Sequence, residues 1–185
     1  AAGTATDDAL SIVHGGASAV NSIRGQTLIS TDFESITLDT TGTGAAGAQT
    51  VGAIAMTAST GGTTSFNLKG SNSVTIAATT ANVIDASGLT GTTGVTMNAA
   101  AVGVTTITGS AGIDALIGDA SSTINGGGGV DTITGGSGND VINGDAGNDI
   151  IDSNAGTDTV NAGAGNDTVN ISTDADIGSG DTYIG

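Results

Sequence analysis

Aspartate is the residue whose type and spacing in this chain could do chemistry. Between Gly126 and Asn170 one Asp recurs every nine residues, at Asp131, Asp140, Asp149, Asp158 and Asp167. Carboxylates are hard oxygen ligands, and calcium binds about six to eight such oxygens by combining carboxylates with backbone carbonyls. Magnesium suits the pattern less well because it demands a tighter geometry and keeps its waters. The spacing therefore predicts a calcium site that is repeated along the chain.

Other metals and catalytic chemistry find few suitable residues. The chain has no Cys and a single His, His14, which argues against a zinc or copper site. The motifs HExxH and GxSxG and the phosphate-binding Walker loop do not occur, and His14 has no acid–base partner nearby in the sequence. We therefore expect no enzyme activity and no catalytic residue in these 185 residues.

The aspartates belong to a nine-residue unit with two further periodic positions. A Gly stands two places before each Asp and a branched aliphatic stands two places after it, as in Gly138, Asp140 and Ile142. Glycine reaches the backbone angles of tight turns without the steric cost of a Cβ. In the short β-branched half of the unit, the aliphatic points one way and its neighbours the other. Each unit is thus predicted to be a turn followed by one strand.

Stacking of these units decides where the carboxylates lie. If consecutive strands lie on opposite sides of a flattened coil, two units make one turn of about eighteen residues, and successive turns stack at about 4.8 Å. The aspartates of alternate units then share one edge of the coil. Like charges about 5 Å apart repel by roughly 1 kcal/mol in water and by several times that at an effective dielectric of about 20. Because no Lys or Arg follows Lys69, we expect a divalent cation between the turns, held by Asp and by turn carbonyls.

The units resemble the nonapeptide GGxGxDxUx of the RTX (repeats-in-toxin) family, where U is an aliphatic residue. Gly126–Thr134 and Gly135–Asn143 match it at every defined position, and the three later units keep the fourth-place Gly and the sixth-place Asp. The resemblance implies an all-β fold, a right-handed parallel β-helix or β-roll, with calcium in its turns. The expected metal ligands are Asp114, Asp131, Asp140, Asp149, Asp158, Asp167, Asp176, Gly112, Gly127, Gly129, Gly136, Gly138, Gly147, Gly156, Gly163 and Gly165.

Less regular copies flank the five units. Gly109–Ile117 restarts the pattern with Asp114, whereas Gly118–Asn125 is one residue short and lacks the sixth-place Asp. In that short unit Asp119, or the carbonyls of two neighbouring serines, Ser121 and Ser122, are the available substitutes. Near the C-terminus, residues 179–184 resemble a shortened repeat. The predicted metal positions lie between stacked pairs, which are Asp114/Asp131, Asp131/Asp149, Asp149/Asp167 and Asp140/Asp158, with a fifth between Asp158 and Asp176.

The first half of the chain alternates short β runs with Gly/Thr/Ser/Asn turns at spacings of roughly 8–12 residues, typical of a solenoid, sandwich or barrel. The sequence runs from Thr108 into Gly109 with no Pro and no linker around this join, so we expect one continuous coil with two parts. Residues 1–108 lack a regular calcium motif and residues 109–185 carry it; together they would make about ten turns, a rod on the order of 50 Å long. The expected inward residues are Phe33, Ile36, Leu38, Ile54, Met56, Phe66, Leu68, Val74, Ile76, Val83, Ile84, Leu89, Val95, Met97, Val104 and Ile107.

Charge and composition limit the partners. The formal net charge is −16, with 18 acids against Arg24 and Lys69, which disfavours nucleic acid and anionic membranes. No apolar run is long enough to span a bilayer, so we expect no membrane insertion. So few large apolar residues at such a charge predict repeats that stay largely unfolded until metal binds. Because the chain begins without Met or a signal peptide and ends within a repeat-like stretch, we expect a piece of a longer protein.

A second resemblance concerns the stretches before the repeats. The phrases TDFESITLDTTG and ANVIDASGLTGTTGVTM resemble RTX-type bacterial surface-layer (S-layer) proteins, which are Cys-free solenoids that assemble into a crystalline coat. The resemblance implies a structural calcium-binding segment of a secreted protein at the bacterial cell surface, exported by type I secretion. It also implies self-association into a two-dimensional lattice, while any cell-surface glycan would bind through a part outside these residues.

Two alternatives stay open. The chain could be the calcium-binding module of a secreted protease or lipase, in which case HExxH or GxSxG would stand upstream of it. It could also belong to an adhesin. An ice-binding rod would need a rank of Thr at one repeat position, and the third place does not supply it, because it reads Gly128, Ser137, Ala146, Ala155 and Ala164.

Overall fold

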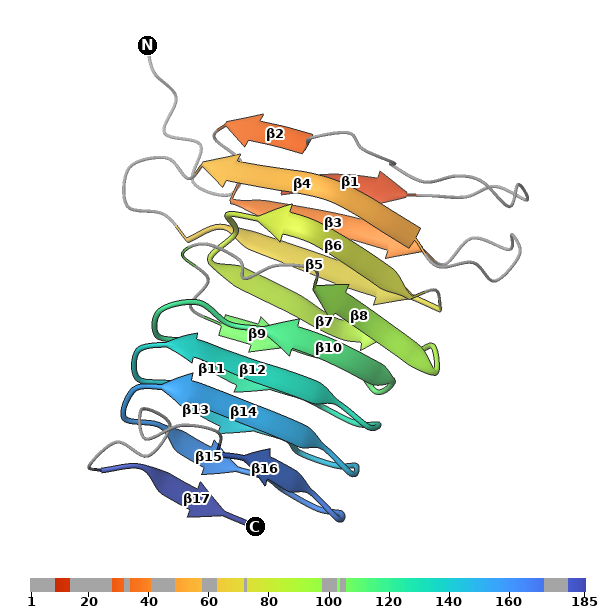
Figure 1. Cartoon of the computed structure of the whole chain (residues 1–185). Coiled ribbons are helices and arrows are strands. Elements are labelled where there is room, and N and C mark those ends of the chain that lie inside the picture. The colour runs from red at the N-terminus through yellow and green to blue at the C-terminus, as the bar shows by residue number, and fades with distance from the viewer. Residues whose placement is uncertain are drawn as a thin grey trace.

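The chain forms a flattened coil of parallel β-strands (Figure 1). The computed structural model describes residues 9–13, 28–31, 34–40, 49–57, 63–71, 73–97, 103, 106–171 and 180–185. Every strand in these ranges pairs with its neighbours in parallel, and the strands form two sheets of nine and eight strands. Among the described residues, no helix is long and apolar enough to cross a membrane. The predicted all-β parallel solenoid is therefore confirmed.

The two sheets divide the strands by odd and even number. The nine-stranded sheet contains β1 (Ala9–Val13), β3 (Ser35–Thr40), β5 (Ser65–Gly70), β7 (Val83–Leu89), β9 (Thr106–Thr108), β11 (Thr123–Asn125), β13 (Val141–Asn143), β15 (Thr159–Asn161) and β17 (Thr182–Ile184). The eight-stranded sheet contains β2 (Leu28–Thr31), β4 (Gln49–Thr57), β6 (Val74–Thr79), β8 (Thr93–Met97), β10 (Ile113–Ile117), β12 (Thr132–Ser137), β14 (Ile150–Ala155) and β16 (Thr168–Asn170).

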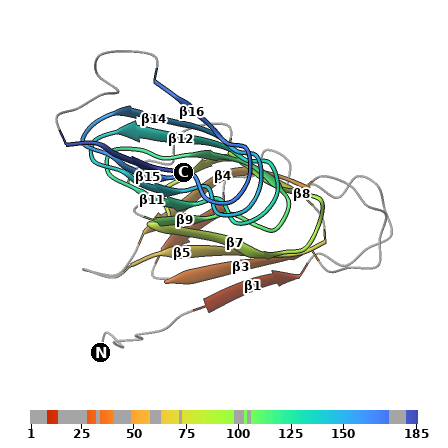
Figure 2. The same cartoon turned by 90° about the horizontal axis from the view of Figure 1, so that it is seen from below.

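Consecutive strands lie in opposite sheets, so each pair of strands makes one turn of the coil. In Figure 1 the even strands run to the left in front, the odd strands run to the right behind, and the chain descends, which makes the coil right-handed. Figure 2, seen from below, shows the two sheets as two layers joined by turns at both edges. Right-handed crossovers are the rule for parallel strands in one sheet, and the predicted handedness is confirmed.

The length of a turn differs along the chain. In the repeats, hydrogen bonds between neighbouring turns join residues 18 apart, as predicted. Nearer the N-terminus, Ser35 pairs with Ser65 and Val83 with Thr106, which are steps of 30 and 23 residues. The prediction of about ten turns is therefore wrong, because it applied eighteen residues per turn to the whole chain. Nine stacked strands at about 4.8 Å give a rod on the order of 40 Å long.

The core between the sheets is a single file of aliphatic side chains in the repeats. Ile133, Ile142, Ile151 and Val160 are fully buried, one in each of β12 to β15. Earlier strands bury more, as in β5, where both Phe66 and Leu68 are inside. The other predicted inward residues that are buried are Ile36, Leu38, Val74, Ile76, Ile84, Leu89, Val95, Met97 and Ile107.

One predicted inward residue is placed differently, and some are not tested. Val83 is only half-buried, because it alternates with the fully buried Ile84 in β7. Phe33 and Val104 lie outside the described residues, and Ile54 and Met56 fall in β4, for which the backbone alone is described.

Both sheets run unbroken past Gly109, since β7 pairs with β9 and β8 with β10. The division into residues 1–108 and 109–185 stays a prediction.

Candidate metal centre

Two columns of aspartates run along the two edges of the coil, where the strands begin. We define the first column as Asp114, Asp131, Asp149 and Asp167, which enter the eight-stranded sheet, and the second as Asp140, Asp158 and Asp181, which enter the nine-stranded sheet. The first column follows the turns on the right of Figure 1 and the second follows those on the left. The predicted sharing of one edge by alternate units is confirmed by the parallel register of the strands.

Each column is a ladder of hydrogen bonds between neighbouring turns. The Asp131 N–H donates to Asp149 Oδ1 at 2.9 Å, and the Asp140 N–H donates to Asp158 Oδ1 at 2.9 Å. The bonds Asp114 N–H to Asp131 Oδ1 at 2.8 Å and Asp149 N–H to Asp167 Oδ1 at 2.9 Å extend the first column. One oxygen of each accepting carboxylate is therefore bound to the backbone of the turn before it.

The second oxygen of these carboxylates has no such partner. Oδ2 is buried and accepts no hydrogen bond from the described residues in Asp131, Asp140, Asp149 and Asp158. Burial raises the pKa of Asp131 to about 7 and that of Asp140 to about 6, and neighbouring carboxylates add to both shifts. Burial also raises the pKa of Asp149. Burying an ionised group without a partner is costly, so a positively charged ligand beside these oxygens would stabilise the fold.

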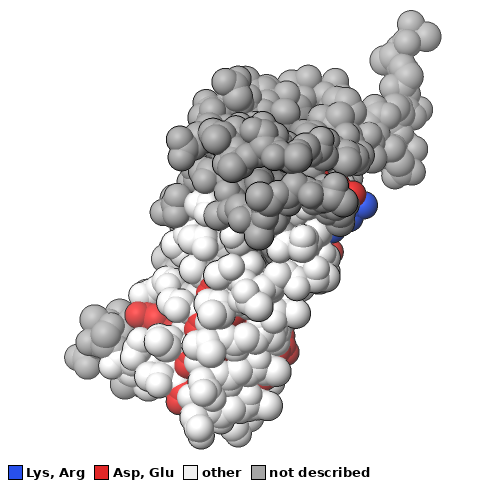
Figure 3. All heavy atoms as spheres, turned by 90° about the vertical axis from the view of Figure 1, so that its right-hand side faces the viewer, with Lys and Arg blue, Asp and Glu red and all other residues white. Residues whose placement is uncertain are grey.

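Side-chain cations do not supply that ligand. Within the described ranges the only Lys or Arg is Lys69, whose Nζ lies 3.0 Å from Asp39 Oδ2, far along the chain from both columns. Figure 3 shows acidic atoms over the lower, C-terminal part only as small patches, as expected for carboxylates turned into the coil. Nor do three His, Cys, Asp or Glu side chains of the described part converge on one point. A metal here must therefore take most of its ligands from the backbone.

Backbone carbonyls approach the unpaired oxygens over the first-place glycines of three units, which are Gly126, Gly135 and Gly144. A Cβ added to Gly126 would lie 2.8 Å from Asp131 Oδ2 and 2.6 Å from the carbonyl oxygen of Gly144, one turn on. A Cβ on Gly135 would likewise lie 2.7 Å from Asp140 Oδ2 and 2.6 Å from the Ser153 oxygen. Carboxylate and carbonyl oxygens thus meet in a space that a side chain would fill. This donor set suits calcium, which combines carboxylates with carbonyls.

The predicted fourth-place glycines are packed against the turn before them. A Cβ on Gly156 would overlap the carbonyl oxygen of Gly138 and lie 2.8 Å from Asp158 Oδ1, so both oxygens lie close to the second column. The same overlap with a carbonyl of the preceding turn occurs at all the predicted fourth-place glycines, which are Gly112, Gly129, Gly138, Gly147, Gly156 and Gly165.

The second place of the unit adopts a left-handed backbone. The predicted glycines there have φ of +99° (Gly127), +128° (Gly136) and +100° (Gly163). Asp145 and Asn154 replace this glycine in two units and keep φ of 68° and 62°. Asn and Asp tolerate this region better than other residues with a Cβ, so the substitutions leave the turn intact.

The C-terminal end of the second column corrects one prediction. Asp176 lies outside the described residues, whereas the Asp158 N–H donates to Asp181 Oδ1 at 2.8 Å, so Asp181 takes the place predicted for Asp176 beside Asp158. Thr159 pairs with Thr182 in the same register. The sequence did contain a signal for Asp181, because this residue lies in the shortened repeat of residues 179–184.

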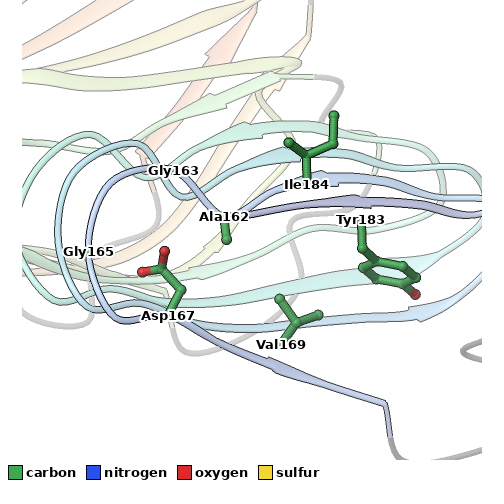
Figure 4. Close-up of a pocket in the computed structure, with 8 residues that line it drawn as sticks. Ala162, Gly163, Gly165, Asp167, Val169, Tyr183 and Ile184 are labelled. Carbon is green, nitrogen blue, oxygen red and sulfur yellow. The ribbon is translucent and has the colours of Figure 1, made fainter.

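The last turn leaves a pocket at the end of the first column. Ala162, Gly163, Gly165, Asp167, Val169, Tyr183, Ile184 and Gly185 line it. Figure 4 shows the side chains of Asp167, Val169 and Tyr183 pointing into this pocket and that of Ile184 pointing away. Asp167 thus faces the end of the described coil with no turn beyond it to add a carbonyl.

The N-terminal ends of the columns are built from serines. Asp114 does stack on Asp131, as predicted, but its Oδ2 accepts the Ser110 N–H at 2.7 Å. In the second column Ser122 holds the place of an aspartate, and its N–H donates to Asp140 Oδ1 at 2.7 Å. Asp119, a predicted substitute, does not join the column, because its Oδ2 accepts the Gly103 N–H at 2.9 Å.

Most of the turns that carry the two columns match a known protein-family model. Residues 120–151 and 134–169 match the RTX calcium-binding nonapeptide repeat (4 copies). Such repeats are calcium-binding motifs, their β-roll modules are typically structural rather than catalytic, and the proteins that carry them are typically secreted by bacteria. Searches of the curated proteins and of the solved structures give no significant match. The matched residues include Asp131, Asp140, Asp149 and Asp158, whose buried Oδ2 has no donor among the described residues.

Proposed function

We propose that this chain is a calcium-stabilised structural segment of a secreted bacterial surface-layer protein that assembles into a lattice. The observation that carries the proposal is the double column of buried Asp oxygens that have no donor within the described part of the chain. Such oxygens make the folded repeats dependent on a cation, and a chain with a cation-dependent fold becomes rigid only where that cation is present.

The proposed ligands come from neighbouring turns. Oδ2 of Asp131, Asp140 and Asp149 would bind calcium together with the carbonyl oxygens that meet them over the first-place glycines Gly126, Gly135 and Gly144. Oδ2 of Asp158, whose unit has Ser153 in the first place, would be a further carboxylate ligand. Asp167 would contribute at the end of the first column. When bound, calcium supplies the positive charge that the columns lack, and the turn glycines let the carbonyls approach. The predicted second- and fourth-place glycines shape these turns and are proposed to supply further carbonyls.

Exposed aliphatic residues on the repeats support contacts with other molecules. Ile113 and Val130, at the turns of the first column, are 51% and 47% exposed, and Val141 and Ile150, at the starts of their strands, are 42% and 44% exposed. These residues project from neighbouring turns of one rod. Ile113 and Ile150 lie in the eight-stranded sheet and Val141 lies in the nine-stranded sheet, so both sheets offer apolar side chains for contacts with other molecules.

The proposal is tested by assembly of the purified protein with and without calcium. We expect ordered two-dimensional arrays in electron micrographs at millimolar calcium and their dissolution on addition of EGTA, with magnesium unable to restore them. Arrays that persist after all calcium is removed, or a calcium-loaded protein that stays monomeric at every concentration, would contradict it.

A further inference from the structure

We propose that Ser110 takes the place of a cation at Asp114, so that the turn Gly109–Asn125 is a calcium-independent cap from which the calcium sites begin. The inference rests on the proposed calcium binding and deepens it, because it names where the metal sites stop. It replaces the expectation that Asp114 is a metal ligand like the other aspartates of its column.

The first step is the set of donors around Asp114. Its Oδ1 accepts the Val95 N–H, and its Oδ2 accepts the Ser110 N–H at 2.7 Å and the Ser110 hydroxyl at 3.0 Å. Asp114 and Ser110 are 1% and 4% exposed, so these bonds are shielded from water. Asp131, one turn on, has a donor on Oδ1 and none from the described residues on Oδ2. Asp114 is thus satisfied by the protein, and Asp131 is not.

The second step is the backbone at the second place of the unit. In the five later units this residue has a positive φ, and at Gly127 the N–H donates to Asp145 Oδ2 at 3.3 Å and not to its own Asp131. Ser110 does not adopt a positive φ, and its N–H points back at Asp114. The Ser110 hydroxyl also accepts the Gly112 N–H at 3.0 Å, which fixes the side chain in the turn. Ser110 therefore gives Asp114 Oδ2 the protein donors that Oδ2 of Asp131, Asp140, Asp149 and Asp158 lacks among the described residues.

The third step is the other edge of the same turn of the coil. Ser122 stands where the second column would have an Asp, is 3% exposed, and accepts the Asp119 N–H on its hydroxyl at 3.2 Å. The unit therefore closes its turn without adding a buried charge. Both columns begin on a serine-built turn, and the two serines share one turn of the solenoid.

The test counts calcium ions bound per chain, by equilibrium dialysis, in the wild type and in matched variants of the full chain. Asp131→Asn should lower the count by at least one, whereas Asp114→Asn should leave it unchanged. Ser110→Gly restores the glycine that Gly127 has at the second place and frees Asp114 Oδ2, so it should raise the count by one. Ser137→Gly, an exposed third-place serine in the turn of a calcium unit, controls for added backbone freedom and should change nothing.

Hydrogen exchange gives a second readout that does not depend on binding. In EGTA the amides of Val95 and Ser110 should stay protected in the wild type and lose protection in Ser110→Gly, which calcium should then restore. Equal loss of calcium from Asp114→Asn and Asp131→Asn, or an unchanged count in Ser110→Gly, would overturn the inference. A wild-type chain that binds no calcium would instead overturn the proposed function on which it rests.

Discussion

The turn at Asn82 and the turn at Asp140 occupy the same place in the coil, but within the described part of the chain the second polar atom of the side chain has a partner only at Asn82. Each residue stands directly before a strand of the nine-stranded sheet and accepts, on Oδ1, the N–H of the residue one turn earlier: Thr64 for Asn82 at 3.0 Å and Ser122 for Asp140 at 2.7 Å. The Asn82 amide then donates from Nδ2 to the Gly103 carbonyl at 3.3 Å, whereas Asp140 Oδ2 is buried without a partner among the described residues. The same side chain-to-backbone bond is thus made by a neutral amide in the earlier turn and by a carboxylate in the later one.

In the proposed function, calcium dependence would arise from one atom in each nine-residue unit, the carboxylate Oδ2. Replacing an amide nitrogen by a carboxylate oxygen keeps the ladder but turns a satisfied donor into an unpaired acceptor. The earlier turns also bury more apolar surface, with Phe66 and Leu68 inside one strand, while each repeat strand buries a single aliphatic. The proposed function therefore predicts that the N-terminal turns fold by protein contacts alone, while the repeats need an ion.

Removal of calcium should have the largest effect and should separate the two regions. In EGTA we expect the backbone amides of residues 131–169 to lose their protection almost completely, while those of β5, β6 and β7 keep theirs. Hydrogen exchange with mass spectrometry measures both regions in one sample. Equal loss of amide protection in both regions, or equal protection in both, would contradict the expected difference between them.

Filling a turn with one methyl group should be nearly as severe in the repeats. Gly156→Ala would place a Cβ over the Gly138 carbonyl oxygen, so we expect loss of a calcium site and of several kcal/mol of stability. Gly128→Ala is the matched control, because its Cβ would come no closer than 3.6 Å to its neighbours, and its third place is already Ala in Ala146 and Ala164. Its cost should stay within about 0.5 kcal/mol. Calcium titrations and thermal melts compare the two variants.

Exchange of amide and carboxylate between the two regions should give effects of opposite sign. Asp140→Asn removes an unpaired buried charge, so it should stabilise the calcium-free protein by about 1–3 kcal/mol and weaken the calcium-bound one. Asn82→Asp should destabilise the rod by a similar amount, because it creates an acceptor facing the Gly103 carbonyl. Denaturant titrations with and without calcium measure these changes. If the Asp140→Asn protein is less stable both with and without calcium, the carboxylate does not destabilise the calcium-free protein and the prediction is wrong.

Acid should partly replace calcium in the repeats, with a smaller effect. The folded pKa values of about 7 for Asp131 and about 6 for Asp140 lie above the unfolded value of 3.8. Between pH 4 and 7 the calcium-free folded state therefore binds more protons than the unfolded state, and its free energy of unfolding falls as pH rises through this window. Circular dichroism of calcium-free protein should show more strand at pH 5 than at pH 8. More strand at pH 8 would contradict the burial of these carboxylates in the calcium-free state.

The strict nine-residue period explains what could be predicted from the sequence. Because the period of Asp131, Asp140 and Asp149 fixes both strand alternation and turn length, the two edges and their stacked pairs follow from spacing alone. Where the period fails, the prediction fails as well. The sequence between the last regular unit, which ends at Asn170, and Asp181 departs from the nine-residue period and so concealed the register of Asp181. The long N-terminal turns made the coil shorter than eighteen residues per turn implies.

Contacts of single atoms were beyond the sequence pattern. Asp114 has the same place in its unit as Asp131, and nothing in the spacing distinguishes them; the difference lies in the backbone and hydroxyl of Ser110. The first-place glycines were overlooked for a related reason. Gly126 and Gly135 matter because Oδ2 and a carbonyl from the next turn meet beside them, which depends on the stacking of turns and not on the unit itself.

The most direct test is a crystal structure of the calcium-loaded protein with anomalous diffraction data. The account predicts an anomalous peak beside Oδ2 of each of Asp131, Asp140, Asp149 and Asp158, within ligand distance of a carbonyl from the adjoining turn, and none beside Asp114. Absence of peaks at those four oxygens in crystals grown with saturating calcium would contradict it.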